Sequence, residues 1–172
     1  HDTDLLCWLN SGNKPDEVSS FGSRSTFVPA NKPTDAADKC FDCKYKETCI
    51  YSCFQNIKNK HMDPIIFNNA VAGKRYDELT DDEKIKVLKE SPSLGYCAFS
   101  GPQDLVDHQS TIVKFENGVT CALTMTGGTS YPCRTMHVIL TKGEIYGTFE
   151  FSKVHVRKYI HDKFKVENKT IY

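Results

Sequence analysis

The 172-residue sequence predicts an α+β fold with a largely antiparallel, open-faced β-sheet and helices packed on one face of that sheet. Two observations lead to this class. Helical patterns and caps dominate the first half of the chain, whereas alternating strand patterns fill the second half. The clearest strand pair is joined by a short Asn-Gly turn, which connects antiparallel strands. At this length we expect one domain, residues 1–172.

The chain opens with a predicted helix followed by a predicted strand. HDTDLLCWLNSGN (1–13) has acidic residues in its first turn, which suits a helix N-terminus. Leu5, Trp8 and Leu9 are expected to form its apolar face. EVSSFGSRSTFV (17–28) is rich in aromatic and β-branched residues and is expected to form a strand.

Two further helices are predicted in the middle of the chain. Apolar residues recur at intervals of four and three between about Thr48 and Asn59, which predicts a helix there. In YDELTDDEKIKVLKESP (76–92), Thr80 and Glu83 have the spacing of a capping box. Pro92 is expected to end this helix.

The second half predicts a series of antiparallel strands. STIVKFENGVTCALTM (110–125) contains two alternating runs, and its Asn117-Gly118 pair suits a type I′ turn. RTMHVILTKGEIYGTFEF (134–151) predicts a second hairpin that turns at 141–143. Two more strands are expected at 153–160 and 163–168.

Charge and hydropathy narrow the classes of partner. The chain has 22 basic and 22 acidic residues, so nothing indicates binding to nucleic acid or to an anionic membrane. No apolar run approaches the roughly 18 residues of a membrane span, and no membrane partner is expected. Because the chain begins at His1 instead of Met, we expect a piece of a longer protein. The composition and the clustered cysteines favour a cytoplasmic protein with reduced thiols.

CFDCKYKETCIYSC (40–53) concentrates four of the eight cysteines with the spacing C-x2-C-x5-C-x3-C. A short C-x2-C loop lets two thiolates meet one tetrahedral zinc ion, and two more thiolates would complete a structural site. Cys53 and Cys97 are alternative fourth ligands on this spacing. Reduced thiols without metal and disulfides remain alternatives, and an iron–sulfur cluster fits the spacing less well.

Two polar clusters are candidates for chemistry. His1 and Asp4 share a face of the first helical turn, where an imidazole can move a proton and a carboxylate can orient it. Strand alternation at 106–109 predicts that Asp107 and Gln109 lie on one side and His108 on the other. Spacing alone also fits exposed polar residues without function in both clusters.

Several strings together resemble one known family. They are HDTDLLCWL, KPDEVSSFGSRSTF, CFDC…CIYSC, VDHQSTIVKFENGVTCALTM and RTMHVILTKGEIYGTFE, in this order over nearly the whole chain. They look like the family named for glucose–fructose oxidoreductase, inositol dehydrogenase and MocA. The resemblance implies that this chain is the C-terminal domain, with an open sheet, substrate contacts and an oligomer interface. The N-terminal Rossmann domain, which binds NAD or NADP in that family, is absent from the chain.

The resemblance also implies roles for individual residues. His1 corresponds to the family's catalytic histidine, and Asp4 to a substrate or orienting contact. We add His108, at the edge of the sheet, as a contact for substrate hydroxyls. The cysteine-bearing members of the family imply a zinc set with Cys53 as the spare thiol. This set is Cys40, Cys43, Cys49 and Cys97.

The expected function is that of an NAD(P)-dependent oxidoreductase acting on a sugar, inositol or related polyol, with homo-oligomers formed through the sheet face. The chain alone is expected to be inactive, since it holds no hydride acceptor. One alternative keeps the fold and uses bound NAD transiently in a redox-neutral glycosidase or epimerase. Another alternative is a zinc-stapled binding module without catalysis.

Overall fold

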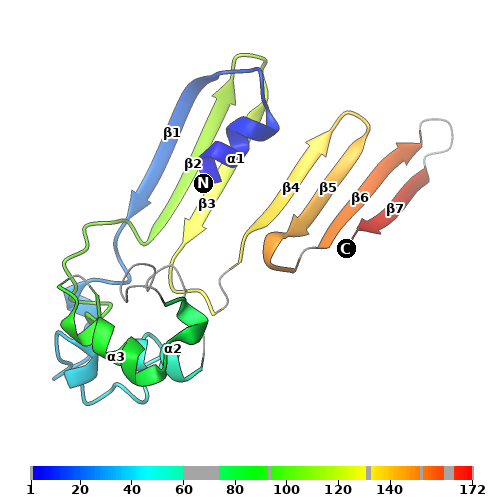
Figure 1. Cartoon of the computed structure of the whole chain (residues 1–172). Coiled ribbons are helices and arrows are strands. Elements are labelled where there is room, and N and C mark those ends of the chain that lie inside the picture. The colour runs from blue at the N-terminus through cyan, green and yellow to red at the C-terminus, as the bar shows by residue number, and fades with distance from the viewer. Residues whose placement is uncertain are drawn as a thin grey trace. The chain divides into compact units, whose positions relative to one another are not determined.

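The computed structural model describes residues 2–59, 74–92, 94–130, 133–151, 153–160 and 165–171. These residues contain helices and antiparallel sheets, so the predicted α+β class is confirmed (Figure 1). They form two compact units, within residues 1–128 and 129–172. The helices are α1 (Asp2–Leu9), α2 (Cys53–Lys58) and α3 (Asp81–Glu90). The strands are β1 (Pro15–Ser23), β2 (His108–Phe115), β3 (Thr120–Thr126), β4 (Thr135–Leu140), β5 (Gly143–Thr148), β6 (Lys153–Ile160) and β7 (Lys165–Ile171).

The first unit contains a three-stranded antiparallel sheet in the order β1-β2-β3. Thr111, Val113 and Phe115 alternate along β2 and are buried on one face. Helix α1 packs on this face against β3. Burial and the nearby Cys7 raise the pKa of Cys121, which lies in register with Val113. The opposite face of the sheet is open.

The predicted apolar face of α1 is wrong in part. The first helix is present, but Trp8 is 69% exposed and Leu9 is 42% exposed. Leu5 is half-buried as predicted, and the other half-buried apolar residues are Leu6 and Cys7. The prediction chose the larger side chains by their hydrophobicity, whereas the contact of α1 with β3 involves the smaller Cys7 side chain.

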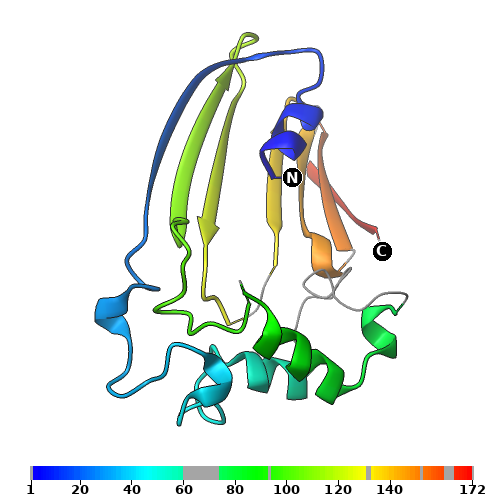
Figure 2. The ribbon, with the colours of Figure 1, turned by 60° about the vertical axis from the view of Figure 1, so that its left-hand side comes forward.

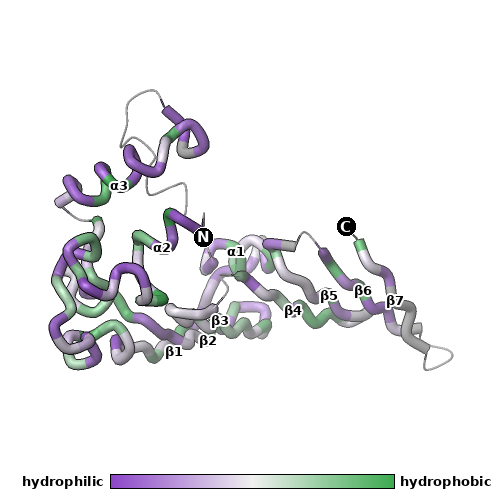
Figure 3. Tube along the Cα trace, turned by 90° about the horizontal axis from the view of Figure 1, so that it is seen from below, coloured by the Kyte–Doolittle hydropathy of each residue, from purple (hydrophilic) through white to green (hydrophobic). Residues whose placement is uncertain are grey.

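Helices α2 and α3 form a separate small core in the first unit. Phe41, Ile57, Leu79 and Leu88 are buried together there. Hydrophobic positions are interspersed among hydrophilic ones along α3, as its amphipathic pattern requires (Figure 3). Figures 1 and 2 show α2 and α3 beyond one end of β1–β3, the strands of the same unit. The prediction that helices cover one face of the sheet therefore holds for α1 and is wrong for α2 and α3.

Local capping explains where the two later helices begin. Helix α2 starts at Cys53 instead of near Thr48, because the Ser52 side chain accepts the N–H of Gln55 and acts as the N-cap. The predicted capping box of Thr80 and Glu83 is present at the start of α3.

The β2–β3 hairpin is confirmed, but its predicted type I′ turn is wrong. That turn needs positive φ at both central residues. Among the described residues other than glycine, only Asp35 has a positive φ, whereas Gly118 has a φ of 82°. The Gly118 N–H donates to the Phe115 carbonyl at 2.9 Å. The Phe115 N–H also donates to the Val119 carbonyl at 2.9 Å, so this pair closes a three-residue loop, 116–118, that ends in a left-handed glycine.

The second unit is a four-stranded antiparallel sheet in the order β4-β5-β6-β7. The predicted β4–β5 hairpin is confirmed, with Leu140 opposite Gly143. The single sheet expected from the sequence is thus two hydrogen-bonded sheets in the described part of the chain. No helix among the described residues is long and apolar enough to span a membrane.

Candidate functional site

The candidate site is built on Asp107, immediately before β2 in the first unit. The carboxylate is buried and accepts the backbone N–H groups of Ser25, Thr26 and Phe27, the last two at 2.7 and 2.8 Å. The Phe27 N–H, with His108 and the other amides, holds the pKa of Asp107 well below its usual range despite burial. Asp107 is therefore a fixed negative charge near neutral pH.

This carboxylate orients the imidazole of His108, the first residue of β2. His108 Nδ1 lies 2.8 Å from Asp107 Oδ1, and His108 Nε2 lies 3.0 Å from Ser23 Oγ. Because an ionised carboxylate only accepts hydrogen bonds, we assign the proton of the neutral ring to Nδ1. Nε2 is then an acceptor aimed at a hydroxyl group.

The pairing of β1 with β2 brings the hydroxyl to the ring. Ser23 is directly opposite His108 in the ladder, so both side chains project from the same open face. Gly22 helps to keep the strands close at this point, because a Cβ there would meet the His108 carbonyl oxygen at 3.0 Å. The contact joins residues 85 positions apart in the chain.

An open hollow of about 420 Å³ lies over this part of the sheet. The side chains of its open face combine hydroxyl groups, one imidazole and one exposed aromatic ring. They belong to Phe21, Ser23, His108, Ser110, Thr124 and Thr126. Such a neutral surface, rich in hydroxyl groups, suits a ligand that is itself neutral and hydroxylated.

The serine, histidine and aspartate have the donor–acceptor order of a hydrolase triad. Acyl transfer also needs backbone N–H donors for the oxyanion. The nearby amides of 25–27 all donate to Asp107, so they do not serve that purpose. The arrangement therefore favours binding or deprotonation of a hydroxyl over attack by Ser23 on an acyl group.

The structure places the predicted site residues separately. His1 lies outside the described residues. Asp4 is exposed on α1, which packs on the sheet face opposite the hollow. The structure therefore does not bring Asp4 together with His108, although His108 does line the hollow.

The predicted alternation holds for His108 and Gln109, which are successive residues of β2, and is wrong for Asp107. Strand β2 begins at His108, so strand periodicity does not extend to Asp107, whose carbonyl instead accepts the Gly127 N–H. The Asp107 and His108 side chains bond to each other as a result. Ser23 was missed because it lies in a serine-rich strand, and only the strand register distinguishes it from Ser19 and Ser20.

The cysteines are arranged differently from the predicted zinc set. Cys40 is buried beside Cys53. The hydrogen bond between the two thiols lowers the pKa of Cys40 and raises the pKa of Cys53. Ser52 Oγ lies 3.4 Å from Cys40 Sγ. Cys97 approaches through its backbone, since its N–H donates to the Asp38 carbonyl at 2.8 Å. No three histidine, cysteine or acidic side chains among the described residues are placed to hold a metal ion. Cys40, Cys43, Cys49 and Cys97 are thus not gathered around one point.

Comparisons of the chain with protein-family models, with curated proteins and with solved structures found no match. The structure itself defines the chain as an α+β protein with antiparallel sheets.

Proposed function

We propose that the chain is the C-terminal substrate-binding and oligomerisation domain of an NAD(P)-dependent oxidoreductase acting on a sugar, inositol or related polyol. The family is that of glucose–fructose oxidoreductase, inositol dehydrogenase and MocA, on the sequence strings given above. The observation that carries the proposal is His108 Nε2, oriented by Asp107 toward a hydroxyl in a hollow lined by hydroxyl groups.

Ser23 indicates how a substrate hydroxyl binds. Its O–H donates to Nε2 at 3.0 Å, and a polyol hydroxyl that replaced it would meet the same acceptor. The Asp107 charge would stabilise the imidazolium if the proton moved to the ring. His108 is in this way a contact, and a possible proton acceptor, for one hydroxyl of the substrate.

The proposal assigns the rest of the reaction to His1, which lies outside the described residues, and to the Rossmann domain. His1 acts as general acid or base toward the reacting hydroxyl in this proposal. The chain has no G-x-G-x-x-G fingerprint, so in this proposal the Rossmann domain would hold NAD or NADP, which would supply the hydride-transfer chemistry. The chain alone is accordingly inactive.

The exposed sheet face and the thiols support the remaining parts of the proposal. Ile112 is 57% exposed on the open face of β1–β3 and is not among the residues that line the hollow, which favours homo-oligomers formed through this part of the face. We propose a cytoplasmic location on the composition and the clustered cysteines, since such proteins keep their thiols reduced. The arrangement of Cys40, Cys43, Cys49 and Cys97 does not support the structural zinc expected from the resemblance, and metal analysis of the purified chain tests that expectation.

The binding step is tested by titrating the chain with inositol, glucose and other polyols while recording the His108 ring signals by NMR. We expect one polyol to shift these signals saturably. Calorimetric titration, which needs no His108 ring, is expected to show that His108→Ala weakens binding of this polyol by about tenfold, the value of one good hydrogen bond. Ser19→Ala is the matched control, because Ser19 lies on the same face opposite Ile112 and not opposite His108. If no polyol shifts the ring, or if both variants weaken binding equally, the proposed role of His108 is wrong.

The reaction is tested with the full-length protein that contains this chain. Polyol and oxidised cofactor are expected to give net reduced cofactor, and the chain alone to give none. Turnover without net reduction would instead support the redox-neutral alternative. Turnover by the isolated chain would contradict the division of labour between the two domains.

A further inference from the structure

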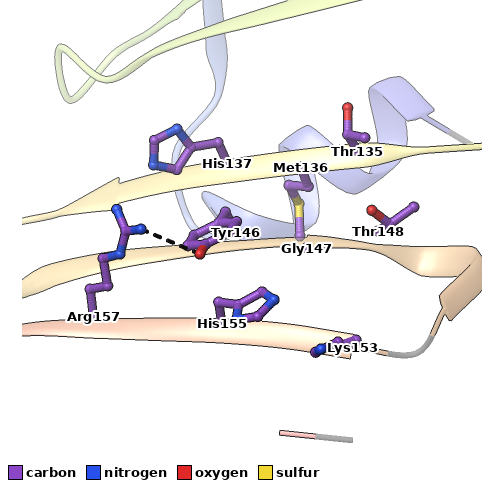
Figure 4. A pocket seen from close by; sticks show the side chains of 9 residues that line it. All are labelled: Thr135, Met136, His137, Tyr146, Gly147, Thr148, Lys153, His155 and Arg157. Atoms are coloured by element: carbon purple, nitrogen blue, oxygen red, sulfur yellow. Dashed lines mark hydrogen bonds between the residues drawn. The ribbon is translucent and has the colours of Figure 1, made fainter. Parts of the chain in front are cut away.

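The second unit has a polar face that the proposed function does not use. Strand register places its side chains in two rows that cross β4, β5 and β6. Figure 4 shows His137, Tyr146 and His155 in one row, and Thr135, Thr148 and Lys153 in the row beside it. An open hollow of about 620 Å³ lies over both rows. This volume is in the range of small-molecule sites.

One edge of the hollow is held by a network around Glu144. Its carboxylate binds His137 Nε2 at 2.6 Å and Arg157 Nη1 at 3.0 Å. These partners, His137 first, lower the pKa of Glu144. Arg157 also donates to the Tyr146 hydroxyl at 3.3 Å, and its guanidinium lies over the Tyr146 ring. The network fixes the aromatic row and neutralises the carboxylate.

The His155 ring is oriented in a similar way. It stacks on Tyr146 with a centroid separation of 4.7 Å, and its Nδ1 contacts Thr170 Oγ1 at 3.2 Å. No hydrogen-bond partner of His155 Nε2 is found among the described residues. The His155 side chain, which carries Nε2, lines the hollow together with Lys153.

The chemistry of the lining is that of an anion site. None of the residues that line the hollow is acidic; Lys153 adds a positive charge, whereas the charge of Arg157 is paired with Glu144. Thr135 and Thr148 are directly opposite each other in the ladder, and Thr148 is opposite Lys153. An ammonium, two hydroxyls and an imidazole N–H are donors that phosphate oxygens accept strongly.

We propose that this face of β4–β6 binds the phosphate group of a small phosphorylated molecule. Lys153 supplies charge, Thr135 and Thr148 donate hydroxyl hydrogen bonds, and His155 Nε2 donates when the ring is protonated or carries its proton there. The aromatic row of Tyr146 and His155 forms a surface for the remainder of the ligand.

The test is an NMR titration of the chain with inorganic phosphate at constant pH and ionic strength, with chloride as the reference anion. We expect saturable shifts at Thr148 and His155, and about tenfold weaker binding for Lys153→Gln, since one charge-assisted hydrogen bond is lost. Lys158→Gln is the matched control. It removes the same charge from the same strand, but from the opposite face.

Two results would overturn the proposal. One is the absence of saturable shifts on this face. The other is an equal loss of phosphate affinity in Lys153→Gln and Lys158→Gln, which would mean that phosphate binding depends only on the net charge of the chain. Should Lys153→Gln fail to fold, Thr148→Val gives the same discrimination by removing one hydroxyl donor. An unchanged phosphate affinity of that variant would also refute the assigned contacts.

Discussion

Replacement of Leu88 by alanine tests the small helical core of the first unit. Leu88 is 1% exposed and packs with Phe41, Ile57 and Leu79. The substitution removes three buried carbon atoms, worth about 2.4 kcal/mol at roughly 0.8 kcal/mol each. The cavity left behind adds to this loss, so we expect about 3 to 4 kcal/mol of lost unfolding free energy.

The loss of stability in Leu88→Ala should extend to the segment that contains Cys40. Gly95, with a φ of +71°, lies so close to the Leu88 carbonyl that a Cβ there would overlap it. The Gly95 carbonyl in turn accepts the Cys40 N–H at 2.8 Å. Loosening of α3 should therefore expose the Cys40 amide to hydrogen exchange.

Urea unfolding followed by far-UV circular dichroism measures the free energy, and amide exchange measures the local effect. Leu105→Ala is the matched control. Leu105 is 73% exposed, and the same truncation there should change stability by less than about 0.5 kcal/mol. Equal effects of the two variants, or a loss below about 1 kcal/mol for Leu88→Ala, would refute the assigned core.

Three further predictions concern the two sheets. In Asp107→Asn an amide NH₂ replaces one acceptor oxygen, so the His108 ring should lose its single orientation and show ¹⁵N signals of mixed tautomers; unchanged signals would contradict the assigned anchor. In Gly143→Ala, a Cβ would overlap the Arg157 carbonyl, and calorimetry should show about 1–3 kcal/mol of lost stability; an unchanged melting temperature would be inconsistent with this close approach. Glu144 has a lowered folded-state pKa, so it stabilises the fold above its unfolded value of about 4.5 and loses this effect as pH falls through the folded value. Thermal unfolding of Glu144→Gln should thus differ from that of the parent at pH 7 and converge with it in acid; a constant difference would refute the linkage.

Local sequence signals predicted the elements whose determinants are themselves local. The capping box at Thr80 and the alternation around Asn117-Gly118 depend on residues within a few positions of one another. The sequence predicted the start of α2 too early, because the apolar periodicity begins before Ser52. The true start depends on one hydroxyl, that of the N-cap Ser52. The turn type at Gly118 required φ values, which the Asn-Gly pair alone does not determine.

The candidate site could be predicted only in part, because its geometry is long-range. His108 was selected for its residue type, but its orientation depends on Asp107, whose own position depends on the amides of 25–27. Ser23 joins the site through the β1–β2 register. No spacing along the chain reports the register between β1 and β2, since α2 and α3 lie between them in the sequence.

The two sheets carry opposite binding chemistry, and this difference makes the two proposals independently testable. Over β1–β3, His108 is paired with the buried Asp107 carboxylate, and the other side chains that line the hollow are neutral. Over β4–β6, the lining contains Lys153 and Arg157 and no acid. A neutral polyol should therefore shift the His108 signals and leave His155 unchanged, whereas phosphate should do the reverse. A single ligand that moved both histidines equally would argue against both assignments, since the same chemistry cannot be preferred by a neutral hollow and a basic one.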